Sequence, residues 1–199
     1  MAFIDTIPTD AARGDVADMY ETDRAGWGFL PNFTRAYSHR PDVYAAWRGL
    51  NGSIKANMDE RRYELATLAA ARRLRSSYCS LAHGRVLARH MPAAAVRNIV
   101  LGQPSDELDE VDMAVIHLAD KVAADATTVT QADIERLRGL GLSDAEILDV
   151  VLAAAARCFF SKVLDAVGCE PDSAFNELLE PGLRDALTVG RPIAAADGG

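Results

Sequence analysis

A capping box followed by a long apolar segment most constrains how this chain can fold. Ser143-Asp144-Ala145-Glu146 places a hydroxyl at a helix start and a carboxylate three positions later, a pairing that satisfies two free backbone N–H groups. The helix predicted over about 144–168 carries apolar side chains on more than one face. Such a helix has to be covered by other parts of the protein, because an apolar circumference is unfavourable in water. The sequence therefore predicts that this helix is central.

The other segments have helical rather than strand periodicity. A proline at position 41 and capping residues at positions 59, 105 and 130 are typical of helix starts. Residues 26–33 hold two glycines, a proline and three aromatic residues, which predicts an irregular loop with buried rings. Helices are predicted over about 9–24, 41–52, 59–74, 77–90, 93–101, 106–125, 130–139 and 144–168, with a short one from 172. The predicted fold class is all-α.

Composition limits the partners and the compartment. The 199 residues carry a net charge of −8 and no basic stripe that would follow a phosphate backbone, so no nucleic-acid partner is expected. The longest apolar run, 150–156, is too short to cross a bilayer, so no membrane association is expected. Three cysteines without a close-spaced pair argue against a disulfide framework, and the first residues lack a signal-peptide pattern. We expect a single globular unit in the cytoplasm.

One stretch carries the candidate chemistry. Cys79 and His83 are four positions apart, so they lie on one face of the helix predicted over 77–90. Glu64 lies on the preceding helix, and the short connection at 75–77 folds the two helices into an antiparallel pair. A thiol beside a base that is oriented by an acid is the general layout of an activated cysteine nucleophile. Glu64, Cys79 and His83 are therefore candidate catalytic residues.

The densest basic cluster lies just before this stretch. Arg72, Arg73 and Arg75 fall at the end of a predicted helix, where positive charge complements the helix dipole. A second interpretation is that they attract an anion or favour the thiolate form of Cys79.

These residues resemble the carboxymuconolactone decarboxylase and alkylhydroperoxidase D-like (AhpD-like) family. Its redox members carry a glutamate and then, after eleven residues, the pattern Cys-x-x-Cys-x-x-x-His. Glu64, Cys79 and His83 stand at the matching positions of this chain, and Ser76 takes the place of the first cysteine. 

The resemblance extends over about residues 25–175. The segment 28–32, the Arg40-Pro41 step and the segment 159–172 look like the peroxidase-related branch of the family. The resemblance implies an AhpD-like helical bundle in which an antiparallel helical hairpin carries the site, assembled as a homo-oligomer (dimer, trimer or hexamer).

Within this frame, three parts of the chain are expected. Residues 1–57 would form an N-terminal arm and helices that pack on the core, residues 58–180 the AhpD-like core, and residues 181–199 a C-terminal tail, frayed from about residue 190.

The resemblance also implies a chemistry. Cys79 would attack a small hydroperoxide substrate, Glu64 and His83 would relay protons, and no cofactor is needed. Ser76 would stand where a second thiol resolves the oxidised cysteine, and a hydroxyl cannot form a disulfide. The expected activity is therefore hydroperoxide reduction through a single cysteine, resolved by an external thiol reductant or by Cys158 or Cys169.

Two other functions stay open. Glu64 and His83 also suit non-redox proton transfer of the carboxymuconolactone decarboxylase type, with an arginine holding a small carboxylated substrate. Alternatively the site is catalytically degenerate and the protein serves in binding or assembly, with Cys79 packed in the core and His83 bonded to Glu64. A metal site is disfavoured, because no fourth ligand follows at a clear spacing.

The other two cysteines have different expected environments. Cys158 lies on the most apolar helix and is predicted to be inert packing, whereas Cys169 follows Gly168 in a turn and is predicted to be more exposed.

Overall fold

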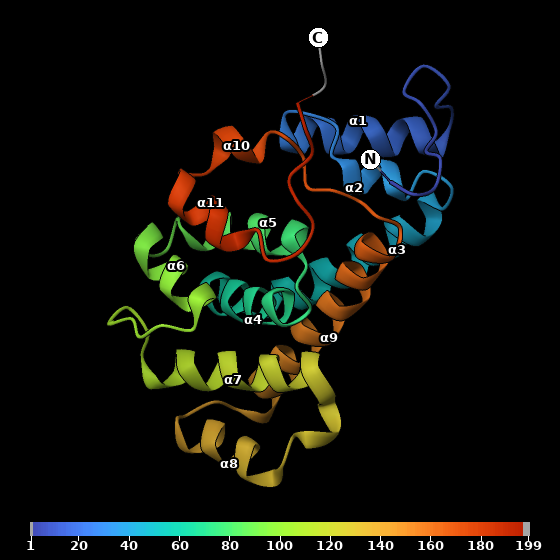
Figure 1. Ribbon diagram of the computed structural model, residues 1–199. Helices are drawn as coiled ribbons and strands as arrows, with labels where there is room; N and C mark the ends of the chain where they lie inside the picture. Colours follow the sequence, from blue (N-terminus) through green and yellow to red (C-terminus); the bar gives the residue numbers. More distant parts are fainter. Residues whose placement is uncertain (1, 197–199) are drawn as a thin grey trace.

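The computed structural model describes residues 2–196, and within this range it contains helices and no strand (Figure 1). The α-helices are α1 (Asp15–Trp27), α2 (Asn32–Ala36), α3 (Pro41–Ala56), α4 (Glu60–Arg73), α5 (Ser77–Leu87), α6 (Ala93–Leu101), α7 (Glu110–Asp125), α8 (Gln131–Gly139), α9 (Asp144–Ala166), α10 (Phe175–Leu178) and α11 (Pro181–Leu187). One turn of 3-10 helix, η1 (Ala126–Thr128), follows α7. The all-α prediction is confirmed.

Side-chain caps set several helix starts. Asp59 caps α4 and Ser143 opens α9 with the predicted capping box. The prediction that Ser105 starts a helix is wrong, because α7 begins after Asp109, which forms a reciprocal capping box with Asp112. Reciprocal bonding satisfies two N–H groups at that position, whereas Ser105 only closes a local turn.

Two further predicted boundaries are corrected. The chain at residues 9–14 forms turns on the Pro8 carbonyl, so α1 begins only at Asp15. Helix α3 does not end at Gly52 but continues to Ala56, since Gly52 is not among the glycines with positive φ.

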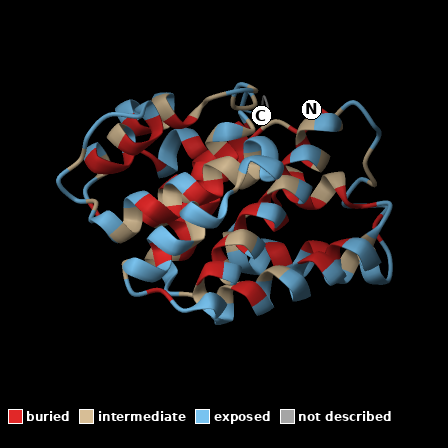
Figure 2. Ribbon diagram, turned by 90° about the horizontal axis from the view of Figure 1, so that it is seen from below, coloured by how far each residue is buried: buried red, intermediate tan, exposed pale blue. Residues whose placement is uncertain are grey.

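The centre of the bundle is α4. All nine residues from Tyr63 to Ala71 are buried, and α5, α7 and α9 pack around this helix (Figure 1). Figure 2 shows that buried residues gather on the inner sides of the helices and exposed ones on the outer sides. Four of the nine are alanine and one is threonine, so neighbouring helices approach α4 closely on several sides. Glu64 therefore lies on the most deeply buried helix, and α5, which carries Cys79 and His83, packs directly against it.

Helix α9 packs against α3, α4, α5, α7 and α8, which confirms the prediction that it is central. Its outer side stays exposed at Leu148, Leu152 and Phe159. No helix between residues 2 and 196 has the length and apolarity needed to cross a membrane.

A sharp turn folds α4 and α5 into the predicted antiparallel hairpin. Arg75 adopts a left-handed conformation with φ 57°, and the Ser76 N–H donates to the Ala71 carbonyl at 3.0 Å. This arrangement ends a helix within one residue and reverses the chain. As a result α5 returns along α4 with Cys79 and His83 on the same side as Glu64.

The C-terminal segment is anchored as far as it is described. Helix α11 packs on α5 and α6, the Gly190 N–H donates to Ser77 Oγ at 2.7 Å, and the Ala194 N–H donates to the Pro171 carbonyl at 2.9 Å. The predicted fraying from residue 190 is therefore wrong for residues 190–194, and its last part, 197–199, lies outside the described residues.

The contact between α5 and α11 generates a stability prediction. A Cβ atom added at Gly84 would lie 2.5 Å from Leu187 Cδ2, and Leu187 is fully buried. We expect Gly84→Ala to lower the free energy of unfolding by about 1–3 kcal/mol through overpacking, measured by urea denaturation.

Gly49→Ala is the matched control, since Gly49 lies in exposed helix with no atom within 4 Å of an added Cβ. It should stabilise the protein by up to about 1 kcal/mol through helix propensity. If Gly84→Ala behaved like Gly49→Ala, the close packing of α5 on α11 would be contradicted.

Candidate functional site

A cavity of about 350 Å³ lies where α3, α4, α5 and α9 meet, with α1 and α2 at one end. Most of its surface is apolar, and the rings of seven phenylalanine, tyrosine and tryptophan residues contribute to the wall. These rings belong to Trp27, Phe33, Tyr44, Trp47, Tyr63, Tyr78 and Phe160. The polar groups on the lining include the three side chains that the sequence singled out, Glu64, Cys79 and His83.

Glu64 and His83 form a close pair on the lining of the cavity. Glu64 lies on α4 and is 1% exposed, and His83 lies on α5 with its Nδ1 at 2.6 Å from Glu64 Oε2. A buried carboxylate needs hydrogen-bond donors and positive charge around it. Lys55 on α3 supplies the second partner, with Nζ at 3.6 Å from Glu64 Oε1.

The pair has a defined protonation state at neutral pH. Burial alone would raise the pKa of Glu64, but His83, and to a lesser degree Lys55 and Arg157, outweigh burial and hold that pKa below 4.5. Burial and the charge of Arg157 lower the pKa of His83 below 6.5, against the opposing effect of Glu64. Glu64 is therefore ionised and His83 neutral. Since the carboxylate can only accept, the imidazole proton lies on Nδ1, and the lone pair of Nε2 is free to accept a proton.

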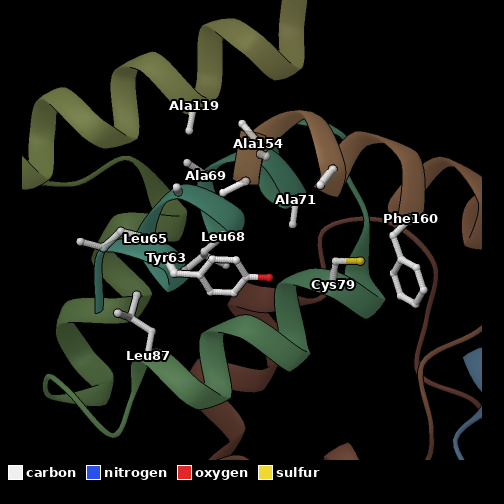
Figure 3. Packing of buried hydrophobic residues seen from close by; sticks show 14 of the residues in the cluster. Tyr63, Leu65, Leu68, Ala69, Ala71, Cys79, Leu87, Ala119, Ala154 and Phe160 are labelled. Atoms are coloured by element: carbon white, nitrogen blue, oxygen red, sulfur yellow. The ribbon is translucent and has the colours of Figure 1, made fainter. Parts of the chain in front are cut away.

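Cys79 lies in the first turn of α5 and is 2% exposed. Its Sγ atom is 3.7 Å from Nη1 of Arg157, which comes from α9. Figure 3 shows the Cys79 side chain on α5 with its sulfur directed to the side where Phe160 lies, and Tyr63 on the facing helix. A helix N-terminus and a neighbouring guanidinium both stabilise a thiolate.

Arg157 is the central cation of the cavity. It is 4% exposed, its guanidinium lies 5.7 Å from the ring centroids of both Trp47 and Phe160, and Nη2 donates to Tyr63 Oη at 3.3 Å. Burial opposes the positive charge of Arg157, but the interactions with Cys79 and Tyr63 outweigh it and raise the pKa of this group. The guanidinium is therefore charged and held in place beside the thiol.

Tyr63 links this cation to α3. Its hydroxyl accepts from Arg157 and donates to Asn51 Oδ1 at 2.7 Å, and the Tyr63 and His83 rings meet edge to face with centroids 6.0 Å apart. The tyrosine thereby fixes the orientation of both the guanidinium and the imidazole.

The structure brings together three of the four predicted site residues. Glu64, Cys79 and His83 line one cavity, whereas Ser76 does not. Ser76 is fully buried at the start of α5, and its hydroxyl makes no hydrogen bond of ordinary geometry. Burial raises the pKa of the Asp165 carboxyl, and the nearby Ser76 hydroxyl lowers it by a smaller amount.

The arginines near the hairpin do not reach the cavity. Arg72 donates to the Ile99 carbonyl at 2.8 Å, Arg73 pairs with Asp120, and Arg75 is exposed at the turn. The interpretation that they favour a Cys79 thiolate is therefore wrong. These side chains make their contacts elsewhere, and the arginine that contacts the Cys79 sulfur is Arg157, from a distant part of the sequence.

The prediction for Cys169 is also wrong. Its side chain is 3% exposed, and burial, with Asp172 nearby, strongly raises the pKa of the thiol. The segment after α9 is covered by other parts of the chain, which hides the turn. Cys158 is partly buried on α9, and burial raises its pKa as well.

Sequence reasoning missed Arg157, Tyr63, Asn51 and Lys55. Only Arg157 carried a signal in the sequence, because it interrupts the apolar face of the helix predicted over 144–168. A lone arginine within such a helix is rarely buried without a functional or structural partner. Within residues 2–196, no group of three or more acidic, histidine or cysteine side chains could hold a metal ion.

Comparison with known proteins identifies the fold. No family description and no curated protein sequence matches this chain. Among solved structures, an uncharacterized peroxidase-related protein with an alkylhydroperoxidase AhpD core from Ralstonia eutropha JMP134 superposes with a TM-score of 0.79 at 20% identity, over 87% of this chain and 94% of that one. An uncharacterized peroxidase-related protein from Silicibacter sp. TM1040 gives 0.71 at 19% identity, over 87% and 90%.

A third similar structure is the debrominase Bmp8, a cysteine-to-alanine variant in complex with 2,3,4-tribromopyrrole, with a TM-score of 0.72 at 17% identity over 89% of this chain and 97% of that one. The chain therefore has the AhpD-like fold of peroxidase-related proteins, as the resemblance in its sequence implied. At these identities the likeness establishes the fold and leaves the reaction open.

The lowered pKa of His83 is measurable. We expect the ring protons of His83, assigned with a His83→Gln variant, to titrate in NMR spectra with a midpoint below 6.5. Glu64→Gln should move the midpoint further down, because the carboxylate is the group that favours the imidazolium. A midpoint above 6.5, or an upward shift in Glu64→Gln, would contradict the described pair.

The same pKa shifts give stability a defined pH dependence. Glu64 and His83 both bind protons less readily in the folded than in the unfolded chain. Their contribution to the free energy of unfolding is therefore complete at neutral pH. It declines as the pH falls below 6.5 through His83 and again below 4.5 through Glu64.

Proposed function

We propose that this protein is a thiol-dependent peroxidase that reduces a small organic hydroperoxide through Cys79. The observation that carries the proposal is the position of Cys79 Sγ, 3.7 Å from the buried Arg157 guanidinium and on the same cavity as the Glu64–His83 pair. A cation, a neutral imidazole and an accessible cavity are the features that a cysteine needs to act as a nucleophile on a neutral substrate.

The first half of the reaction follows from the protonation states. Nε2 of His83 takes the thiol proton of Cys79, and Glu64 stabilises the imidazolium that forms. The thiolate, held by Arg157, attacks the terminal oxygen of the hydroperoxide ROOH and breaks the O–O bond. The sulfur becomes a sulfenic acid, Cys–SOH, and the leaving alkoxide takes the proton from His83 to give the alcohol ROH.

The second half requires an external thiol. Ser76 cannot form a disulfide, and the strongly raised pKa of Cys169 makes it a poor nucleophile. We propose that a low-molecular-weight thiol R′SH enters the cavity, condenses with Cys–SOH to a mixed disulfide and releases water. A second R′SH then frees Cys79 and leaves as R′SSR′.

A second candidate reaction uses the same thiol chemistry on an aromatic halide. The aromatic wall of the cavity and the shared fold with the debrominase Bmp8 favour it. Written in full, ArBr and two R′SH give ArH, R′SSR′ and HBr. Release of bromide from brominated pyrroles or phenols without peroxide turnover would support this reaction instead.

The non-redox alternative requires different residues. Proton transfer of the decarboxylase type would use Glu64 and His83 and would not need a thiol. Cys79→Ser therefore separates the two chemistries, because it removes the peroxidase and leaves the acid–base pair in place.

Peroxide chemistry at Cys79 can be tested by trapping. After treatment with cumene hydroperoxide, dimedone should label the wild-type protein at Cys79 only, and hydroperoxide should be consumed when a small thiol is supplied. Cys79→Ser should lose both signals, while Cys158→Ser keeps them. Thiol-dependent turnover that persists in Cys79→Ser would disprove the proposal.

The role of Arg157 gives an independent prediction. Arg157→Met keeps most of the side-chain volume and removes the charge, so we expect Cys79 to react with iodoacetamide roughly tenfold more slowly at neutral pH. Arg75→Met is the matched control, since Arg75 is exposed at the hairpin turn, and it should leave the rate unchanged. Equal rates in the two variants would remove Arg157 from the mechanism.

A further inference from the structure

The charges on the cavity differ from those of the whole chain. The chain carries a net charge of −8, but the cavity is lined by three cations and two carboxylates. The carboxylates are those of Asp23 and Glu64, both buried. With His83 neutral, the lining has an excess of positive charge, which favours a ligand with a negative group.

Two of the cations lie at the outer end of the cavity. Arg48 pairs with Asp23 at 3.1 Å and Lys55 with Glu64 at 3.6 Å, yet their side chains remain 48% and 42% exposed. Arg48 and Lys55 are seven positions apart on α3, which places their backbones about 10 Å apart along the helix axis. Arg157, by contrast, is fully inside, so its charge is available to the reacting sulfur.

Gly52 lies between these two cations. Arg48, Asn51, Gly52 and Lys55 follow the spacing of one helix face, and all four line the cavity. Gly52 has no positive φ, and an added Cβ would meet no atom within 4 Å. Neither backbone conformation nor packing requires a glycine there, although glycine in a helix interior is unfavourable. The missing side chain leaves an opening in the rim of the cavity.

The inner wall is built for a flat molecule. The Trp27 and Phe33 rings meet edge to face at 5.6 Å, as do Phe33 and Tyr78 at 5.5 Å, and the Trp47 ring stacks on Phe160 at 4.9 Å. All these rings line the cavity, and an aromatic lining favours another aromatic ring over a flexible chain.

We propose that the cavity binds an aromatic molecule with a negatively charged group, and that Gly52 is the position that admits it. The ring lies against the aromatic wall, and the charged group stays at the rim between Arg48 and Lys55. The inference rests on the proposed function in that the reactive end of the molecule then meets Cys79 and Arg157. The substrate is thereby an anionic aromatic hydroperoxide rather than hydrogen peroxide.

Binding is tested apart from turnover, in Cys79→Ser protein. The probes are 3-phenylpropanoate and its neutral counterpart 3-phenylpropanamide, with affinity measured by titration calorimetry. The chain has two tryptophans, Trp27 and Trp47, and both line the cavity, so their fluorescence reports whether the probe is bound there. We expect both probes to change this fluorescence and the carboxylate to bind about tenfold more tightly than the amide.

Variants locate the site. Gly52→Leu should weaken both probes by about tenfold or more. Gly49→Leu is the matched control on the same helix, because Gly49 is exposed and does not line the cavity, and it should leave binding unchanged. The double variant Arg48→Gln/Lys55→Gln should bring the ratio of carboxylate to amide affinity to about one, whereas a general change in the shape of the cavity would weaken both probes and leave their ratio unchanged.

The outcomes separate this inference from the proposed function. Equal affinity for the two probes would overturn the charged-group part, and unchanged binding in Gly52→Leu would overturn the entrance. Absence of binding, while Cys79 still reduces hydrogen peroxide, would overturn the inference and leave the peroxidase intact. Binding without any hydroperoxide turnover in the wild-type protein would support the ligand class and reject the peroxidase.

Discussion

The buried carboxylate of Glu64 is the constraint on which the rest of the site depends. An ionised group that is 1% exposed on the central helix is tolerable only with close partners, and breaking such a pair costs about 3–5 kcal/mol. Its partners come from two other helices, His83 on α5 and Lys55 on α3, and Arg157 on α9 contributes through its charge. One carboxylate therefore fixes the positions of four helices around the cavity.

A second group of hydrogen bonds, centred on Arg157, holds the thiol of Cys79. With Glu64 ionised, the imidazole of His83 keeps its proton on Nδ1 and leaves Nε2 as the base. Arg157 holds Cys79 Sγ on one side and the Tyr63 hydroxyl on the other, and Tyr63 in turn donates to Asn51. The acid lies on α4, the base and the thiol on α5, and the cation on α9, so the site forms only when these three helices are packed together.

The inner and the outer part of the cavity carry different side chains. Inside, Arg157, His83 and Cys79 lie among aromatic rings, and we propose that this part holds a flat ligand beside the reacting sulfur. Outside, Arg48 and Lys55 flank the opening at Gly52. Ser76 lies outside the cavity and cannot form a disulfide, so the proposed reduction uses a thiol that enters through the opening.

The sequence by itself determined the all-α fold class, the hairpin and which three candidate residues share one cavity, because helical periodicity, the Asp59 and Ser143 caps and the spacing of Cys79 and His83 act over a few residues. It did not determine which arginine meets the thiol. Arg72, Arg73 and Arg75 are near Cys79 in the chain, but Arg157, 78 residues away, makes the contact. Only the packing of α9 against α4 and α5 decided that, as it decided that Cys169 is buried, because contacts between distant segments depend on how helix faces fit together.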